Sequence, residues 1–250
     1  MYQTIDDIID TLEEIIQDCI RKQDPLGYFA ALYQKVTIKV KEGIQQGIFE
    51  DNPRMEKLDI VFAERYLDAY FNYQKDLPVT ESWQRTFDAS KRFWPVVLQH
   101  LLLGMNAHIS LDLGIAAAEV SKGNNLEDLH DDFNKINEIL SSLVEEVEND
   151  LAGFWPSLKF ILKSTRNVDN FLVDFSMKKA RDGAWKLAQS LHGLPAEALK
   201  IQIDKRDQKV ARKVRLILHP GWVVRIIFAV IRIGERGTVK DKIEELQYKG

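Results

Sequence analysis

The chain has 250 residues, 45% hydrophobic and 29% charged, a balance that argues against both a disordered polypeptide and a membrane protein. A chain of this length buries roughly 70 to 75% of its unfolded surface, so it forms a core without disulfides or structural metal. The formal net charge of −4 excludes a general attraction to nucleic acid, because phosphate binding requires a concentrated surface of lysine and arginine.

Cysteine usage and the amino terminus both predict a cytoplasmic protein. The single cysteine, Cys19, excludes an internal disulfide and a cysteine-rich zinc site, which fits a reducing compartment. The first residues, MYQTIDD, are acidic and amphipathic, without the basic start, apolar run and small-residue cleavage site of a signal peptide. We therefore expect a cytoplasmic chain with no transmembrane segment.

The first 95 residues predict helices separated by proline and glycine breaks. Apolar residues recur at three- and four-residue steps from Ile5 to Cys19, with acids between them, which is typical of an amphipathic helix. The β-branched run Val36 to Val40 weakens the next helical pattern and is equally compatible with a short strand. The expected helices cover 5–19, 28–43, 55–73 and a segment that starts at Thr80 or Ser82.

The most apolar segment, Val96 to Val120, predicts a central helix. It contains no proline, its first charged residue is Asp112, and apolar residues lie on both sides, so other helices should surround it. Gly123-Asn124-Asn125 is a clear stop signal, and heptad-like spacing predicts a further helix from about Leu126 to Leu151.

The last third is less regular, with helical patterns over 154–162, 170–192, 196–219, 222–233 and 239–247. No period of 20 to 50 residues repeats, and no alternation of strands and turns supports a Rossmann or barrel fold. We predict an all-α, single compact bundle of about nine or ten helices around the buried helix 96–120. Residues 1–250 should form one domain, a regular bundle over 1–151 with a less regular helical part, 152–250, packed on it.

Polar side chains interrupt the apolar sequence of the central helix. A carboxylate or imidazole buried there without a partner costs several kcal/mol, so each of them should be paired or neutral. His108 and Asp112 are four residues apart, share a helix face and could chelate one divalent metal such as zinc. His100 lies about 12 Å from His108 along the axis and cannot readily bind the same ion. Alternatively, Asp112 orients His108, and Arg65 or a neighbouring amide completes a structural network.

Flanking helices supply the remaining candidates. Arg65 and Asp68 are close enough to form a surface ion pair, whereas Asp59 and Arg65, on either side of Phe62, are better placed to point inward. Asn137 is the preferred amide to satisfy the buried cluster. The full candidate polar site is Asp59, Arg65, Asp68, His100, Asn106, His108, Asp112, Asp132 and Asn137, with His108 and Asp112 as the metal ligands.

Two segments raise the question of partners. Lys200 to Arg215 is strongly basic, and we interpret it as a solvated helix face without useful affinity for nucleic acid. Trp222 to Ile233 is apolar with two arginines and is too short to span a bilayer. A terminal helix that closes the core is favoured over a helix on a membrane surface.

The run LLLGMNAHISLDLGIAAA at 101–118, with RMEKLDIVFAERYLDAY at 54–70 and DFNKIN at 132–137, resembles an uncharacterised bacterial domain family of unknown function. The resemblance covers most of the chain and implies that the polar positions are a shared feature, but it supplies no reaction. His108 and Asp112 also match the H-x-x-x-D zinc element of the helical phospholipase C and single-strand nuclease fold. That fold places further histidines close behind the aspartate, whereas here the next is His130, so the similarity implies at most one or two metals.

Two functions remain open. In the first, a buried His/Asp site binds a metal or small molecule, and neighbouring carboxylates could make it a metal-dependent hydrolase that activates water. In the second, the chain is a non-catalytic binding or scaffold protein whose polar cluster fixes the helix register. The concentration of polar side chains around one apolar helix slightly favours the first.

Overall fold

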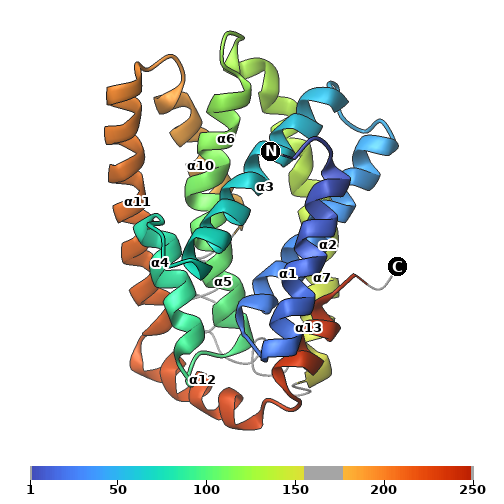
Figure 1. Cartoon of the computed structure of the whole chain (residues 1–250), viewed down its shortest axis with the longest axis vertical. Helices are drawn as coiled ribbons and strands as arrows, with labels where there is room; N and C mark the ends of the chain where they lie inside the picture. The colour runs from blue at the N-terminus through green and yellow to red at the C-terminus, as the bar shows by residue number, and fades with distance from the viewer. Residues whose placement is uncertain (1, 155–176, 249–250) are drawn as a thin grey trace.

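The computed structural model describes residues 2–154 and 177–248, and all regular structure in these ranges is helical (Figure 1). The predicted all-α class is confirmed, with eleven α-helices in the described ranges rather than nine or ten. They are α1 (Ile5–Lys22), α2 (Leu26–Gln45), α3 (Asn52–Gln74), α4 (Glu81–Asp88), α5 (Val97–Ala107), α6 (Leu113–Val120), α7 (His130–Phe154), α10 (Met177–Leu191), α11 (Ala196–Leu218), α12 (Trp222–Gly234) and α13 (Val239–Leu246). The pattern predicted over 154–162 and the start of the one over 170–192 fall almost wholly outside the described residues.

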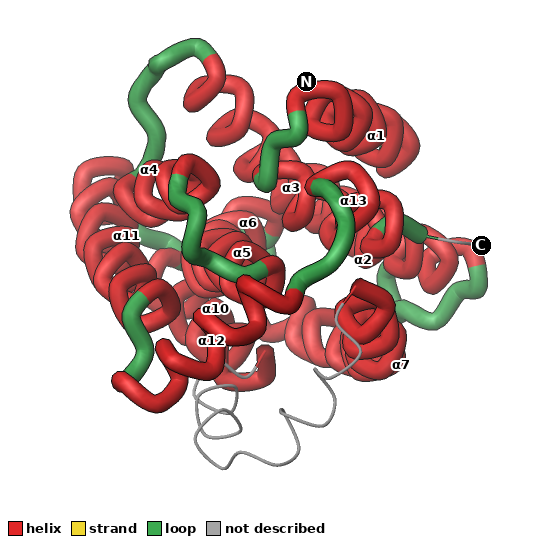
Figure 2. The backbone as a smooth tube through the Cα atoms, turned by 90° about the horizontal axis from the view of Figure 1, so that it is seen from below, coloured by secondary structure: helices red, strands yellow, loops and turns green. Residues whose placement is uncertain are grey.

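The central helix runs from Val97 to Val120 with one change of geometry. Its α5 and α6 portions are joined without a break by the π-helical segment His108–Asp112 (η2), which is one reason why the count exceeds the prediction. Figure 2 shows α5 and α6 in the middle of the bundle, with the other helices around them. By length and composition this helix could cross a membrane, as could the bent pair α11 and α12 together, but 89% of its most apolar window is buried. It is therefore a core helix, as predicted.

Residues 36–40 are helical, so the strand alternative is wrong for this segment. Both faces of α2 contribute to the core, since Tyr33, Lys35, Thr37 and Val40 are all buried. Packing against several helices outweighs the modest strand preference of β-branched residues.

Glycines allow side chains to lie directly on the central helix. A Cβ built at Gly104 would lie 2.3 Å from the ring of Phe29 in α2, so that ring occupies the space of the missing side chain. Phe29 also contacts the edge of the His108 ring, with centroids 5.9 Å apart. The absence of a side chain at Gly104 thus sets the position of an aromatic ring beside the polar cluster.

We predict that Gly104→Ala lowers the free energy of unfolding by about 1 to 3 kcal/mol, because an extra methyl group overpacks the core against Phe29. Gly183→Ala is the matched control: it also lies within a helix, and its new Cβ would meet only the end of the Arg206 side chain, at 3.0 Å. The control should be neutral or stabilising by up to about 1 kcal/mol. Urea unfolding of both variants measures this, and equal stabilities would contradict the packing argument.

Candidate functional site

Asp112 is the centre of a buried network that joins the central helix to α3 and α4. Its Oδ1 accepts a hydrogen bond from Arg65 Nε at 3.0 Å, and its Oδ2 accepts one from Trp83 Nε1 at 2.8 Å. Oδ2 also lies 3.2 Å from His108 Nδ1, one helical turn away. Both oxygens of the carboxylate are therefore occupied by protein groups.

The network contains one negative and one positive charge. Burial alone raises the pKa of Asp112, but the Arg65 charge and the hydrogen bonds from His108 and Trp83 lower it overall, so the carboxylate is ionised. Burial lowers the pKa of His108 against the opposing effect of Asp112, so the imidazole is neutral. The hydrogen bond to Asp112 assigns its proton to Nδ1, which leaves Nε2 as an acceptor.

This arrangement matches the structural network that the sequence allowed, with Arg65 as the predicted partner of Asp112. In the described ranges, no group of three or more histidine, cysteine, aspartate or glutamate side chains is placed to hold a metal ion. The pair His108 and Asp112 thus has no third ligand among those residues, and the similarity to the zinc-dependent phospholipase C fold gains no support.

Of the nine predicted site residues, Arg65, His108 and Asp112 form this network and Asp59 lines the cavity described below, whereas the other five have different positions. Arg65 binds Asp112 rather than Asp68, which is exposed. Asp132 accepts hydrogen bonds from the backbone N–H groups of Glu50 and Asp51 at 2.7 and 3.0 Å, and so fixes the turn before α3. Asn106 and His100 are buried elsewhere along α5: the Asn106 amide donates to the Val210 carbonyl at 3.1 Å, and the His100 ring packs 5.7 Å from that of Tyr28.

Asn137 was expected to supply the amide that satisfies the cluster. Asn137 is half-buried on α7 and makes contacts of its own, but the partners of Asp112 are Arg65, His108 and Trp83. Trp83 fills the role because α4 packs beside α5 and its indole N–H reaches the carboxylate. Trp83 was not among the site residues predicted from the sequence.

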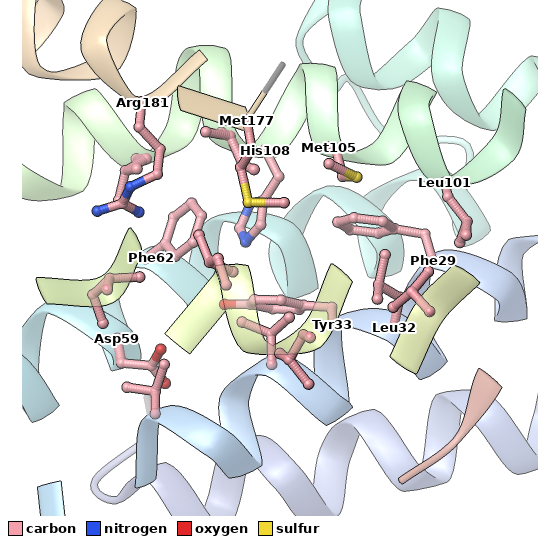
Figure 3. A pocket seen from close by; sticks show the side chains of 18 of the residues that line it. Phe29, Leu32, Tyr33, Asp59, Phe62, Leu101, Met105, His108, Met177 and Arg181 are labelled. Atoms are coloured by element: carbon pink, nitrogen blue, oxygen red, sulfur yellow. The ribbon is translucent and has the colours of Figure 1, made fainter. Parts of the chain in front are cut away.

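A cavity of about 380 Å³ lies beside this network, between α2, α3, the central helix, α7 and α10 (Figure 3). Most of its wall is apolar, including Phe29, Leu32, Leu101 and Met105. The polar or ionisable lining residues are Tyr33, Asp59, His108 and Arg181. Two of these, Asp59 and His108, were predicted site residues, so the structure brings part of the predicted cluster to one apolar cavity.

Arg181 is the one lining residue that carries a full positive charge. Only 5% of it is exposed, and burial, opposed by the charge of the neighbouring Asp182, lowers its pKa to about 10, which still leaves the guanidinium charged at neutral pH. The group lies over the ring of Phe133, 4.3 Å from the centroid, and donates one hydrogen bond to the Phe133 carbonyl. Among the described residues no carboxylate lies within salt-bridge distance of Arg181.

Four buried polar atoms of the cavity wall have no hydrogen-bond partner in the described structure: Tyr33 Oη, Asp59 Oδ2, His108 Nε2 and Arg181 Nε. Burial, with a smaller effect of the Glu56 charge, raises the pKa of Asp59 to about 7. Buried polar groups are normally satisfied, so four unsatisfied atoms around one cavity make it the candidate site of this chain.

A family model described as a family of unknown function, DUF5995, matches residues 5–220. The match contains the whole polar network and all residues named for the cavity. Neither a search of curated proteins nor a search of solved structures found a match.

We predict that Asp112→Asn lowers the free energy of unfolding by about 3 kcal/mol, because it leaves the Arg65 charge without its partner. Asp68→Asn is the control: it removes an exposed carboxylate of α3 and should change stability by less than about 0.5 kcal/mol. Melting curves with and without added zinc complete the test. A zinc-dependent rise in the melting temperature of the wild type, absent from Asp112→Asn, would restore the metal hypothesis.

His100 should make the fold sensitive to acid. Burial, with the nearby Arg232 and Lys242 charges, lowers the pKa of His100 to about 3. Between pH 6.5 and 3 the unfolded chain therefore binds a proton at this residue that the folded chain does not, and stability falls as the pH falls. The contribution is about 1.4 kcal/mol per pH unit. We expect His100→Gln to flatten the pH dependence of stability in that window and exposed His219→Gln to leave it unchanged, as measured by urea unfolding.

Proposed function

The chain belongs to the DUF5995 family, and we propose that it binds an apolar small molecule with one anionic group in the central cavity. The observation that carries the proposal is the buried Arg181 guanidinium, which borders an apolar cavity without a carboxylate partner in the described structure. The proposed role is binding rather than catalysis.

An anion on the ligand would supply the charge that Arg181 lacks. A buried cation without a counter-charge costs several kcal/mol, so a bound carboxylate would stabilise this arrangement. The Nε–H of Arg181 has no acceptor in the described structure, whereas another guanidinium N–H already binds the Phe133 carbonyl. Guanidinium groups recognise carboxylates through N–H donors arranged in a plane, which favours a carboxylate over an anion without a matching shape.

The rest of the cavity favours a hydrocarbon. Figure 3 shows Arg181 and Asp59 towards one end, with Phe29, Leu32 and Leu101 towards the other. Each CH₂ group that enters such a space contributes about 0.8 kcal/mol. A volume of about 380 Å³ lies within the range of small-molecule sites. An amphipathic monocarboxylic acid fits this division into a charged end and an apolar end.

The Asp112 network would orient one further contact for a ligand that also carries a hydrogen-bond donor. Asp112 holds the Nδ1–H of His108, so the unprotonated Nε2 of the same ring is an acceptor on the cavity wall. Phe62 stacks on the imidazole with centroids 3.6 Å apart and planes 8° apart, which fixes the ring plane. In this proposal the polar cluster supports the binding site by orienting His108. It does not favour metal-dependent hydrolysis.

We predict that dodecanoate binds in the cavity and that Arg181→Met weakens this binding by about 10- to 100-fold, the value of a hydrogen bond to a charged group. Dodecanol, which has the same chain without the charge, should bind wild type and variant alike. Isothermal titration calorimetry measures both ligands. Arg206→Met is the control, because Arg206 donates to the Ser110 carbonyl at 2.8 Å and is not part of the cavity wall.

A second measurement separates a binding residue from a structural one. If Arg181 is kept for a ligand, Arg181→Met should leave the empty protein as stable as the wild type or more so, because it removes an uncompensated buried charge. A wild type that does not bind dodecanoate, or an Arg181→Met variant that binds it equally well, would contradict the proposal.

A further inference from the structure

Helix α12 has two apolar faces, and only one of them is packed. Val224, Phe228 and Ile231 are buried and close the end of the bundle, as the sequence predicted for a terminal helix. On the other side, which we call the α12 outer face, the exposed fractions are 75% for Trp222, 56% for Ile226, 57% for Val230 and 79% for Ile233. Exposed apolar side chains repeated along one helix face mark an interaction surface rather than scattered residues.

Two aromatic residues from another part of the chain extend this surface. Phe93 and Trp94, in the turn before α5, are 67% and 61% exposed. Arg232 of α12 holds Phe93: its Nε donates to the Phe93 carbonyl at 2.6 Å, and its guanidinium lies 4.7 Å from the Phe93 ring centroid. The Trp94 ring packs on that of Phe93, with centroids 5.4 Å apart. Figure 1 shows α12 lying across one end of the molecule.

The charge around this surface is positive, although the whole chain is acidic. Residues 208–234 contain no aspartate or glutamate and include six lysines and arginines: Lys209, Arg212, Lys213, Arg215, Arg225 and Arg232. Of these six, only Arg232 is paired with a carboxylate in the described structure, that of the following Glu235. Arg225 is exposed on α12, and Arg92 is exposed directly before Phe93. Glu235, the first acid after this stretch, is turned inward and bound by Arg232 and Lys242, each at 3.0 Å.

We propose that the α12 outer face, with Phe93 and Trp94, binds the surface of a membrane that contains anionic lipid. Aromatic and aliphatic side chains enter the boundary between headgroups and acyl chains, and arginines bind the anionic headgroups. The 13 residues of α12 span about 20 Å, too short for a bilayer core of about 30 Å, so the helix lies in the plane of the membrane.

The charges favour a membrane over the other occupants of such a surface. A nucleic acid would satisfy the arginines but leave the apolar side chains of α12 without a partner. In a symmetric dimer through this face, each copy would bring its Arg225 into the same patch, where like charges repel. A membrane surface that is anionic, with an apolar layer just beneath, matches the two features together.

The full chain is tested by sedimentation with vesicles. We expect binding to vesicles of phosphatidylglycerol and phosphatidylcholine in equal parts, weaker binding as the salt concentration rises, and little binding to phosphatidylcholine alone. The double variant Ile226→Glu with Val230→Glu should bind at least about tenfold more weakly. Arg225→Gln should bind about fivefold more weakly. All three positions are exposed, and unchanged melting temperatures would establish that the variants fold.

Ile201→Glu is the matched control, because Ile201 is a 53% exposed apolar residue of α11 outside the surface. It should bind vesicles as the wild type does. No sedimentation with the anionic vesicles, or equal binding by the double variant, would overturn the proposal. So would a dimer in solution that the double variant dissociates. The proposal does not depend on the cavity ligand, since dodecanoate binding and vesicle binding are measured separately.

Discussion

The ionised carboxylate of Asp112 constrains the whole arrangement, because a buried charge tolerates only a structure that compensates it. Compensation comes from Arg65 of α3 and Trp83 of α4, so the central helix cannot rotate or slide without breaking both contacts. An apolar residue of similar size would often fold as stably at such a position. The charge therefore fixes the positions of neighbouring groups more than it stabilises the fold. It determines that Nδ1 of His108 is held by Asp112 and that Nε2 is left for the cavity.

The other buried cations show why Arg181 differs from a structural charge. Three cationic side chains of the described structure are buried: Lys35, Lys242 and Arg181. Lys35 lies 2.6 Å from Asp150 and 3.0 Å from Glu146, and Lys242 lies 3.0 Å from Glu235. The two buried lysines are thus each paired with a carboxylate. Arg181 has no such pair in the described structure and borders a cavity, where in the proposed function the ligand supplies the negative charge.

The sequence predicted the elements whose signals are local. The apolarity of residues 97–120 specified a core helix, and the spacing of His108 and Asp112 placed them on one face. It did not predict the contribution of Trp83 or Arg181. An aromatic residue in a short helix looks like a core residue, and an arginine in the run MKKARDG looks like a surface residue. Asp132 and Asn106 have the chemistry of a site but bind the backbone of distant segments, a choice that depends on tertiary packing.

The helix that carries Trp83, α4, is held at its start by a residue far along the chain. Asp207 of α11 accepts hydrogen bonds from the backbone N–H groups of Glu81 and Ser82 at 2.7 and 2.9 Å. A carboxylate at a helix amino terminus binds free N–H groups and interacts favourably with the helix dipole. The orientation of His108 therefore depends on Asp112, on Trp83 and in turn on α11, a helix whose sequence indicates only a basic, solvated surface. Support for the cavity wall thus extends beyond the residues that line it.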